Sequence, residues 1–490
     1  MRSRVASLVR QLSSMFSNGF ERLAVYWRQW LVRRLGDRTA LRINAFLSAV
    51  ALPSIALFLA LAVLTYGSHR ATRSAQTPAI VPTAPPLEQT AEPNISRTTL
   101  PQPEEIRGVW ITNVASNVLF APWGIPRAID QLAALQFNTL YPVVWNRGNT
   151  FYRSSFLKDK TGQTIDPLVA LMHPNKDPLE EIVELGHDKG MRVLPWFEYG
   201  FMVPLNSPLA QQHPDWLSRR LNGSRRLEDG TFEGDELPEV EAPTPRRGLI
   251  GQLLSSGAPR QIGWLNPMHP SVQGLLLSLV EEVIANYDID GIQFDDHFSL
   301  PAEFGYDDYT VALYKTEHDG QRPPDDPADA DWISWRAGKL SRFVSILYEK
   351  VKASCPTCTV SISPNPAKFA YRFHLQDWQT WVREGWVDEL VVQIYRDDFE
   401  QFENELDKNP LRVAAEQIPV SVGILTGTWR HPIAFEQIKQ QVESSRVRQF
   451  SGVCFFYWDT LWSYFTPEAP ERRRKNFEQL MAVENSNDAF

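Results

Sequence analysis

From residue 106 onward, short apolar and β-branched runs alternate eight times with stretches that carry the apolar spacing of helices. Strands that are apolar along their whole length are buried on both faces, as in a parallel sheet covered by helices. Eight such units in succession predict an α/β fold, the (β/α)8 TIM barrel with insertions. The alternative is a doubly wound open sheet, which typically has a glycine-rich first turn. The chain contains no G-x-G-x-x-G or phosphate-binding loop, so the barrel is favoured.

The expected strands are 106–112, 138–145, 191–197, 290–295, 358–363, 389–395, 418–424 and 452–458. The expected helices lie near 125–136, 177–190, 271–287, 329–354, 373–385, 399–415, 433–447 and 468–484. Together they delimit a barrel domain at 105–485. Its largest insertion, about 201–270, follows the third strand and mixes aromatic, proline and charged residues. Loops that follow barrel strands lie at the mouth, so we expect this insertion to lie over it.

Residues 43–67 contain no charged side chain over 25 positions. A helix of this length, at about 1.5 Å per residue, spans a hydrocarbon layer of roughly 30 Å, and Pro53 kinks such a helix without forbidding it. A cleaved signal peptide is the alternative, but the preceding basic region is too long and no clear small-x-small cleavage site follows. We therefore expect a single-pass transmembrane anchor.

The charges that flank this anchor predict its orientation. Residues 1–42 hold nine arginines against two acidic residues, and positive charge beside a membrane span stays on the cytoplasmic side. The N-terminus is therefore expected in the cytoplasm, and the barrel in the periplasm or outside the cell, tethered to the inner membrane. Residues 68–104 are rich in Pro, Thr, Ser and Ala and are expected to form a disordered linker.

The basic segment 1–42 also interleaves arginine with Leu, Val, Phe and Trp. An amphipathic helix on the anionic cytoplasmic leaflet is the simpler interpretation, and a docking helix for an envelope protein partner is the other. The rest of the chain is acidic, because the whole carries a formal net charge of −9 despite these arginines. It lacks the clustered basic surface that nucleic acid requires, so no nucleic-acid partner is expected.

Three cysteines limit the choice of metal and redox chemistry. Cys355 and Cys358 form a single C-P-T-C pair, and without a second pair a zinc site is not expected. In an oxidising compartment the two could close a small disulfide, and two unlinked loop cysteines are the alternative. Cys454 lies in an apolar run and is expected in the core.

Carboxylates stand at the ends of several expected strands, most notably in "DIDGIQFDDHF" at 288–298. The C-terminal strand ends of a barrel meet at its mouth, where reactive groups lie. The candidates are Glu198 after the third strand, Asp295 and Asp296 after the fourth, and Asp397 or Asp398 after the sixth. Because strand side chains alternate between faces, we expect one of the adjacent pair to point into the barrel axis, and favour Asp295.

Glycosidic-bond hydrolysis makes the most economical use of these groups. One carboxylic acid protonates the leaving oxygen, and a second carboxylate supports an oxocarbenium-like centre or activates water. Repulsion between neighbouring carboxylates and apolar surroundings raise one pKa above another, as this division of labour requires. The expected catalytic residues are Asp295, Asp296, Glu198 and Asp397. For any one of them, capping the next helix or pairing with an arginine is the structural alternative.

Aromatic and polar side chains at the same strand ends suit a sugar substrate, because pyranose rings stack on flat apolar faces and their hydroxyls need hydrogen-bond partners. The expected substrate-binding residues are Trp145, Asn146, Trp196, Tyr199, Asn266, His297, Asn365, Tyr395, Arg396 and Trp458. Each aromatic residue alone is better explained as core or rim, and their number at one end favours a sugar site. No cofactor is expected. A metal site built from Asp295, Asp296 and His297 is a further alternative, although adjacent residues on an extended strand diverge.

Seven segments occur in order along the expected barrel: "EIRGVWIT" at 105–112, "FNTLYPVVWNRGNTFY" at 137–152, "VLPWFEYGF" at 193–201, "WLNPMHPSV" at 264–272, "YDIDGIQFDDHF" at 287–298, "VSISPNP" at 360–366 and "VVQIYRDD" at 391–398. In this order and spacing the chain resembles the bacterial glycosyl-hydrolase-like family 10, a group of extracytoplasmic (β/α)8 barrels, over roughly 105–465. The resemblance implies hydrolysis of a bacterial surface glycan, peptidoglycan glycan strands first, with the strand-four aspartates central. Many relatives have "WFNPY" in place of "WFEYGF", which counts against a required acid at Glu198.

The "DGIQFDDH" run is also similar to the chitinase-type signature D-G-x-x-x-D-x-E up to Asp295, but His297 stands where that family keeps its acid. Substrate-assisted hydrolysis by a single glutamate is therefore disfavoured. The sequence thus predicts a membrane-anchored glycoside hydrolase that acts on a cell-envelope polysaccharide. The alternative is a catalytically inactive polysaccharide-binding barrel that serves as an envelope scaffold.

Overall fold

The structure, a computed structural model, describes most of the expected barrel domain. The described residues are 100–114, 116–226, 261–428, 431–463 and 466–482. The expected cytoplasmic segment (1–42), the transmembrane anchor (43–67), most of the linker (68–104) and the centre of the insertion lie outside them. Within the described ranges, no helix combines the length and the apolar composition needed to cross a bilayer.

All eight expected strands are present in the described part of the chain and join one parallel sheet. Its order is β5-β2-β1-β13-β12-β11-β10-β9-β6. These strands are β1 (Ile106–Ile111), β2 (Thr139–Pro142), β5 (Arg192–Val193), β6 (Trp196–Phe197), β9 (Gly291–Asp295), β10 (Thr359–Ser363), β11 (Glu389–Gln393), β12 (Val420–Leu425) and β13 (Gly452–Phe456). The parallel α/β fold expected from the sequence is thereby confirmed.

The third expected strand, 191–197, connects the two ends of this order. It is divided into β5, which pairs with β2, and β6, which pairs with β9, with only two residues between them. Pro195 lies in that gap and cannot donate to a strand ladder. Beyond β2, Val143 forms a parallel bridge with Trp196, so the two ends of the strand order meet at one segment. The arrangement is TIM-like, and an open doubly wound sheet does not fit it.

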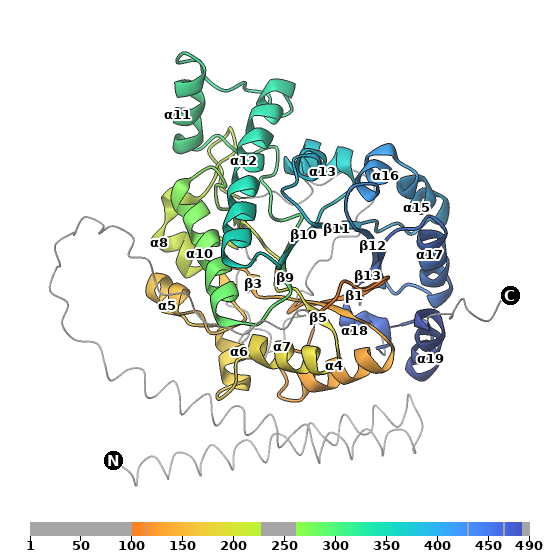
Figure 1. The fold of residues 1–490 in the computed structure, drawn as a ribbon. Coiled ribbons are helices and arrows are strands. Elements are labelled where there is room, and N and C mark those ends of the chain that lie inside the picture. The colour runs from red at the N-terminus through yellow and green to blue at the C-terminus, as the bar shows by residue number, and fades with distance from the viewer. Residues whose placement is uncertain (1–99, 115, 227–260, 429–430, 464–465, 483–490) are drawn as a thin grey trace, which may run out of the picture. The chain divides into compact units, whose positions relative to one another are not determined.

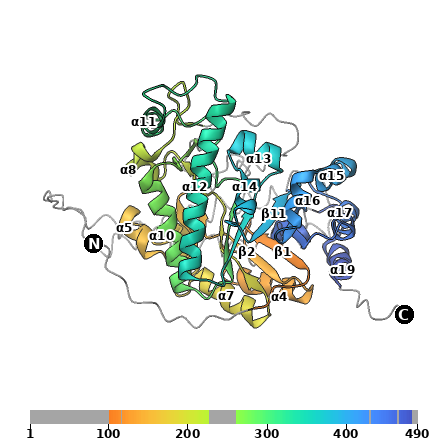
Figure 2. The ribbon, with the colours of Figure 1, turned by 45° about the horizontal axis from the view of Figure 1, so that its top comes forward.

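Helices surround the strands (Figures 1 and 2). The larger ones are α4 (Gly124–Ala134), α7 (Pro178–Asp188), α10 (Pro270–Asn286), α12 (Ala330–Ser354), α13 (Ala367–His374), α14 (Trp378–Arg383), α15 (Phe399–Leu406), α16 (Asn409–Ala415), α17 (Phe435–Val447) and α19 (Pro470–Met481). Further helices are α5 (Ser155–Thr161), α6 (Pro167–Met172), α8 (Pro208–Gln212), α11 (Asp308–Glu317), α18 (Trp458–Leu461) and the 3-10 turn Pro214–Trp216.

Two expected helices are each divided into two. The stretch 373–385 is interrupted because Leu375 adopts a left-handed conformation, with φ 57°, that ends α13. The stretch 399–415 breaks between α15 and α16, where Pro410 stands in the first turn of α16 and cannot continue a preceding helix.

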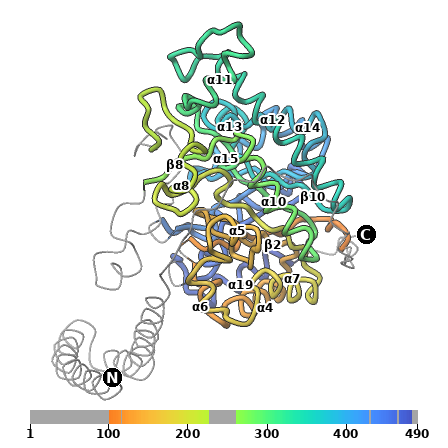
Figure 3. The backbone as a smooth tube through the Cα atoms, turned by 90° about the vertical axis from the view of Figure 1, so that its left-hand side faces the viewer, coloured from red at the N-terminus to blue at the C-terminus, as the bar shows by residue number. Residues whose placement is uncertain are grey.

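The described ends of the insertion pair with each other and reach the mouth. Strands β7 (Met202–Pro204) and β8 (Ile262–Trp264) form an antiparallel pair, beside which α8 lies (Figure 3). The backbone N–H of Phe201 donates to the carbonyl of His297, 3.2 Å away, just beyond the end of β9. The short pair β3 (Trp145–Asn146) and β4 (Asn149–Thr150) follows β2.

Polar side chains cross the barrel interior in two places. Nε1 of Trp110 donates to Oε1 of Gln293 at 2.7 Å. Toward the other end, Glu389 accepts hydrogen bonds from the hydroxyl of Tyr141 at 2.9 Å and from Nη1 of Arg192 at 3.2 Å. Burial of paired groups satisfies their hydrogen-bonding needs, whereas an unpaired charge at such a site is strongly unfavourable.

The cysteines divide as the sequence allowed. Cys355 and Cys358 form a disulfide at the end of α12, so the bonded alternative holds in the structure. Cys454 is buried and unbonded, as expected.

We predict that Glu389→Ala lowers the free energy of unfolding by about 3–5 kcal/mol, because it leaves the buried guanidinium of Arg192 without its partner. The control is Glu281→Ala, which removes a solvent-exposed partner of Lys350 and should cost at most about 1 kcal/mol. Urea-induced unfolding at neutral pH measures both, and equal losses would contradict the prediction.

Candidate active site

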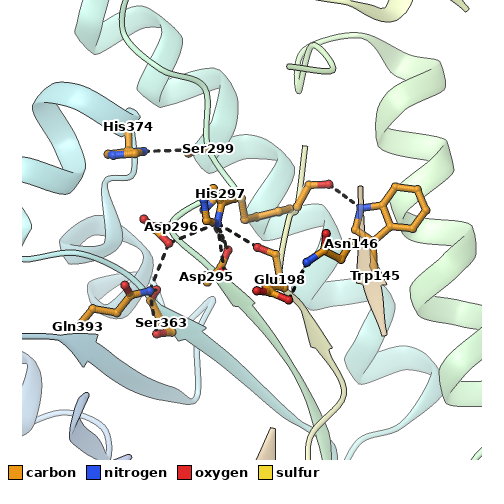
Figure 4. A network of polar contacts seen from close by, with 12 residues as sticks. Trp145, Asn146, Glu198, Asp295, Asp296, His297, Ser299, Ser363, His374 and Gln393 are labelled. Atoms are coloured by element: carbon orange, nitrogen blue, oxygen red, sulfur yellow. Dashed lines mark hydrogen bonds and ion pairs between the residues drawn. The ribbon is translucent and has the colours of Figure 1, made fainter. Parts of the chain in front are cut away.

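Asp295 and Asp296 meet at the imidazole of His297 (Figure 4). Strand β9 ends at Asp295, and the chain turns at Asp296. Nδ1 of His297 lies 3.3 Å from a carboxylate oxygen of Asp295 and 3.6 Å from Oδ1 of Asp296. Strand alternation therefore does not separate the two carboxylates as expected, because the extended conformation stops at the first of them.

His297 is held from below and from the sides. Its Nδ1 lies 3.1 Å from the backbone carbonyl of Glu198, and the rings of Tyr199 and Trp264 lie 5.3 and 6.4 Å from the imidazole. Gly200 packs so closely that a Cβ there would lie 2.6 Å from the carbonyl of His297, so only glycine fits. Burial alone would lower the pKa of His297, but the charges of Asp296 and Asp295 raise it well above its usual value. The ring is therefore an imidazolium at neutral pH.

Asp296 is held in its ionised form. Its Oδ2 accepts a hydrogen bond from Nδ2 of Asn365 at 3.0 Å, and its Oδ1 accepts one from Nε2 of Gln393 at 3.3 Å. Burial alone would raise the pKa of Asp296, but the charge of His297 and these two amides lower it below the usual carboxyl value. The nearby His374 stays neutral, because burial lowers its pKa to about 4.

Asp295 lies deeper and behaves in the opposite way. Its side chain is 3% exposed, against 14% for Asp296. It accepts a hydrogen bond from the backbone N–H of His297 at 2.9 Å. Burial raises the pKa of Asp295 to about 7, despite the attraction of His297. Two adjacent carboxyl groups therefore differ in protonation near neutral pH.

Glu198 is the third carboxyl group of the cluster. It follows β6 and accepts hydrogen bonds from the hydroxyl of Thr112 at 2.9 Å and from Nδ2 of Asn146 at 2.7 Å. Burial raises its pKa, against the effect of these two donors. Because β6 pairs with β9, Glu198 lies close enough to Asp295 for the two charges to repel each other.

Three expected site residues have other partners. Asp397 is 60% exposed and contacts His431 at 3.0 Å, and none of its contacts in the described part of the chain is with the cluster. Arg396 pairs with Glu405 at 3.2 Å, so its guanidinium supports α15. Asn266 is fully buried and donates to Asp307 and Thr310, where it holds the loop before α11. These three side chains therefore make the contacts described here outside the acid cluster, although all three were expected at the site.

Most of the expected aromatic platforms are buried. Trp145 has no exposed surface and donates to the carbonyl of Gly200, while Trp196, Tyr395 and Trp458 are at most 9% exposed. Tyr199 is partly exposed. Trp196 and Tyr395 pack against the rings of Trp110 and Phe456, since space enclosed by strands must be packed to the density of a core.

Sequence reasoning missed several residues of the cluster. Gln393 and Thr112 stand in or after apolar strands, and a polar residue at such a place is the signal that identifies them. Arg147, whose guanidinium lies 5.6 Å from the centre of the Tyr199 ring, and His374 carry no such signal, because their position depends on loop and helix placement.

Ligand atoms of Asp295, Asp296 and His297 lie within 4.8 Å of one another, as a small cation would require. The turn at Asp296 supplies the curvature that an extended strand lacks. A metal bound here would have to displace the proton of the His297 imidazolium and the proton of Asp295, so its binding would release protons.

Comparison with known proteins identifies the family of the chain. The sequence profile of the family described as Glycosyl hydrolase-like 10 matches residues 105–237 and 244–445, which is most of the barrel domain. The chain belongs to the glycosyl hydrolase-like 10 family. The match includes Glu198, Asp295, Asp296 and His297.

Relatives of this glycosyl hydrolase-like 10 chain are distant. It is 23% identical to the glycosyl hydrolase DigH of Escherichia coli K12 in an alignment 350 positions long that covers 61% of this chain and 67% of DigH. It is 20% identical to the glycosyl hydrolase YngK of Bacillus subtilis, covering 59% of this chain and 54% of YngK. Among solved structures, the glycoside hydrolase domain of PgaB from Bordetella bronchiseptica aligns with 78% of this chain and 99% of that domain, with a TM-score of 0.51 and 14% identity. The structural likeness supports the TIM-like fold.

We predict opposite pH dependences for two isosteric variants of this glycosyl hydrolase-like 10 protein. Because the pKa of Asp295 is raised in the folded protein, its ionisation opposes folding, increasingly so from about pH 4 to about pH 7. The free energy of unfolding of Asp295→Asn, relative to that of the unmodified protein, should therefore rise by about 1 kcal/mol per pH unit over that range. Because the pKa of Asp296 is lowered in the folded protein, its ionisation contributes stability above the pKa of about 4 that it has in the unfolded chain, and this stability is lost as the pH falls. Asp296→Asn should therefore have a lower free energy of unfolding than the unmodified protein at neutral pH, and the two values should become equal in acid.

Urea-induced unfolding of both variants and the unmodified protein across this pH range measures the effect. Parallel pH dependences of the two variants would show that the two carboxyl groups are not differentiated.

Proposed function

We propose that the protein is a membrane-anchored glycoside hydrolase that acts on a bacterial cell-envelope polysaccharide, with peptidoglycan glycan strands as the first substrate class. The observation that carries the proposal is the difference between two adjacent carboxyl groups at the barrel mouth. Burial raises the pKa of Asp295 to about 7, whereas, against the effect of burial, His297 and two amides keep the pKa of Asp296 low. A proton source beside an ionised carboxylate is what glycosidic-bond hydrolysis needs.

Asp296 is the carboxylate that a substrate reaches, because it is the more exposed of the two. Ionised, it stabilises the positive charge that develops at the anomeric carbon. The amides of Asn365 and Gln393 fix its orientation, which limits reorganisation as that charge forms.

Asp295 and His297 act as one proton-donating pair. Asp295 lies beneath the imidazole, whose side chain is 30% exposed, so a proton held by the pair reaches the mouth through the ring. The glycosidic oxygen takes this proton as its bond to the anomeric carbon breaks. Water then adds its hydroxyl to that carbon, and its remaining proton returns to the pair. Glu198, buried and with a raised pKa, adds to the repulsion that keeps Asp295 protonated.

The same proposal assigns the barrel to the periplasm or cell surface. Residues 43–67 serve as the span, and the nine arginines of 1–42 keep the N-terminus in the cytoplasm. The disulfide between Cys355 and Cys358 supports this location, because disulfides persist in oxidising compartments. The envelope glycan as substrate is what the family resemblance implies, and DigH and YngK both carry the name glycosyl hydrolase.

We predict that the purified protein releases reducing ends from peptide-stripped peptidoglycan. Asp295→Asn and Asp296→Asn should each lower kcat by about 10²-fold or more, because each removes a proton-transfer or charge-stabilising group. Glu198→Gln should have a smaller effect, since its carboxyl group only adds to the field at Asp295. The matched control is Asp397→Asn, which should keep its activity because that carboxylate contacts His431 outside the cluster.

Unchanged activity in both aspartate variants would overturn the mechanism. Glycan binding without turnover by any form would favour the envelope scaffold, the alternative function. Loss of activity with chelators would favour a metal-dependent hydrolase.

We also predict the pH profile of kcat/KM. Activity should fall about tenfold per pH unit above about pH 7, where the Asp295–His297 pair loses the proton that it passes to the leaving oxygen. On the acid side, activity should fall only below the pH range in which carboxyl groups usually titrate, because the pKa of Asp296 is lowered. A rate that still rises through pH 8 would exclude the Asp295–His297 pair as proton donor.

A further inference from the structure

A pocket of about 180 Å³ lies between the loop that follows β1 and the loop that follows β13. These two strands are paired neighbours in the sheet, and both loops leave their C-terminal ends. The pocket therefore opens on the same rim as the acid cluster, on the side of the sheet across from β9 in the strand order.

Trp123 forms an exposed wall of this pocket. It is 67% exposed and is the one tryptophan among the exposed large apolar side chains of the described residues. A Cβ on the next residue, Gly124, would lie 2.1 Å from the carbonyl oxygen of Val118, so only glycine allows the turn that presents the ring. An exposed indole held by such a turn is a preformed flat surface rather than a side chain that failed to pack.

The opposite wall carries polar groups beside further rings. Asp459 receives hydrogen bonds from Ser116 and from the backbone of Asn117, yet its Oδ2 is buried with no hydrogen-bond partner among the described residues. The side chains of Asn117 and Arg127 are exposed at the pocket. Trp458 and Trp462 pack edge to face at 5.2 Å and complete the lining.

This combination suits one class of ligand. A pyranose ring has an apolar face that stacks on an indole, and its edge carries hydroxyl groups that both donate and accept. Asp459 offers an acceptor that lacks a partner, and the side chains of Asn117 and Arg127 offer donors. An extended apolar ligand would leave this carboxylate without a hydrogen-bond donor.

The pocket lies within reach of a chain bound at the acids. Thr112 donates to Glu198, and Ser116 donates to Asp459. Four residues of extended chain span at most about 14 Å, so the backbones of these two donor residues lie within that distance of each other. The hydroxyl of Tyr457 lies close enough to Asp459 and Glu198 for the charges of both carboxyl groups to raise its pKa.

We propose that this pocket, walled by Trp123 and Asp459, is a second glycan-binding subsite that holds one pyranose ring of a chain whose scissile bond lies at Asp296. This proposal rests on the proposed function, which supplies the identity of the glycan. A subsite at this distance makes affinity depend on chain length, because only a chain long enough to bridge the two positions gains both sets of contacts.

The experiment measures binding in the absence of turnover. The full chain carrying Asp296→Asn is titrated calorimetrically with a soluble β-1,4-linked hexasaccharide of N-acetylglucosamine and with the matching disaccharide. We expect Trp123→Ala and Asp459→Asn, each added to this background, to lower the ratio of hexasaccharide to disaccharide affinity about tenfold. Asp459→Asn keeps the shape of the side chain and puts a donor where the unpaired acceptor stood.

The matched control is Phe373→Ala, which removes an exposed aromatic ring on α13 that is not part of the pocket, and it should leave the ratio unchanged. An unchanged ratio in both pocket variants, or no binding of the hexasaccharide by the background protein, overturns the subsite. Turnover is measured separately on the unmodified protein, so a failure of the proposed hydrolysis is distinguished from a failure of the subsite.

Discussion

The segment 192–197 holds the two ends of the sheet together, and the position of the acids follows from it. It pairs with β2 through its first half and with β9 through its second, with Pro195 at the change of partner. Because β6 lies against β9, Glu198 is carried to the place where β9 ends. Four ionisable side chains from two segments thus meet in a space too small and too dry for all of them to be charged.

Burial decides which of these groups keep their protons. Each carboxyl group loses the solvation that would stabilise its charge. Asp296 recovers enough from His297 and two amides for its pKa to lie below the usual carboxyl value, whereas burial raises the pKa of Asp295 to about 7. Asp295 has the same cation beside it and accepts the backbone N–H of His297, but among the described residues no side-chain amide donates to its carboxylate, and it lies deeper. A difference of partners, rather than of residue type, therefore separates the proton donor from the charge-stabilising group.

The mouth extends beyond this cluster because its loops come from strands on opposite sides of the sheet. Most of the rings expected to bind sugar are buried, whereas the exposed indole of Trp123 lies in the loop after β1. A substrate that is a chain has contacts to make at a distance from its scissile bond, and binding at such distances helps to orient the reacting bond. Two separated positions on one rim are consistent with a polymeric glycan.

The sequence by itself determined the eight strands and the presence of Asp295, Asp296 and Glu198 at strand ends. A strand that is buried on both faces is apolar along its whole length, and this pattern is local in the sequence. It did not distinguish Asn365 and Gln393, which hold Asp296, from Asn266 and Arg396, which hold loops elsewhere. Nor did it reveal that His297 joins the two aspartates. Only the tertiary structure decided these points, because partners and protonation depend on distances between segments such as Glu198 and His297, which lie 99 positions apart in the chain.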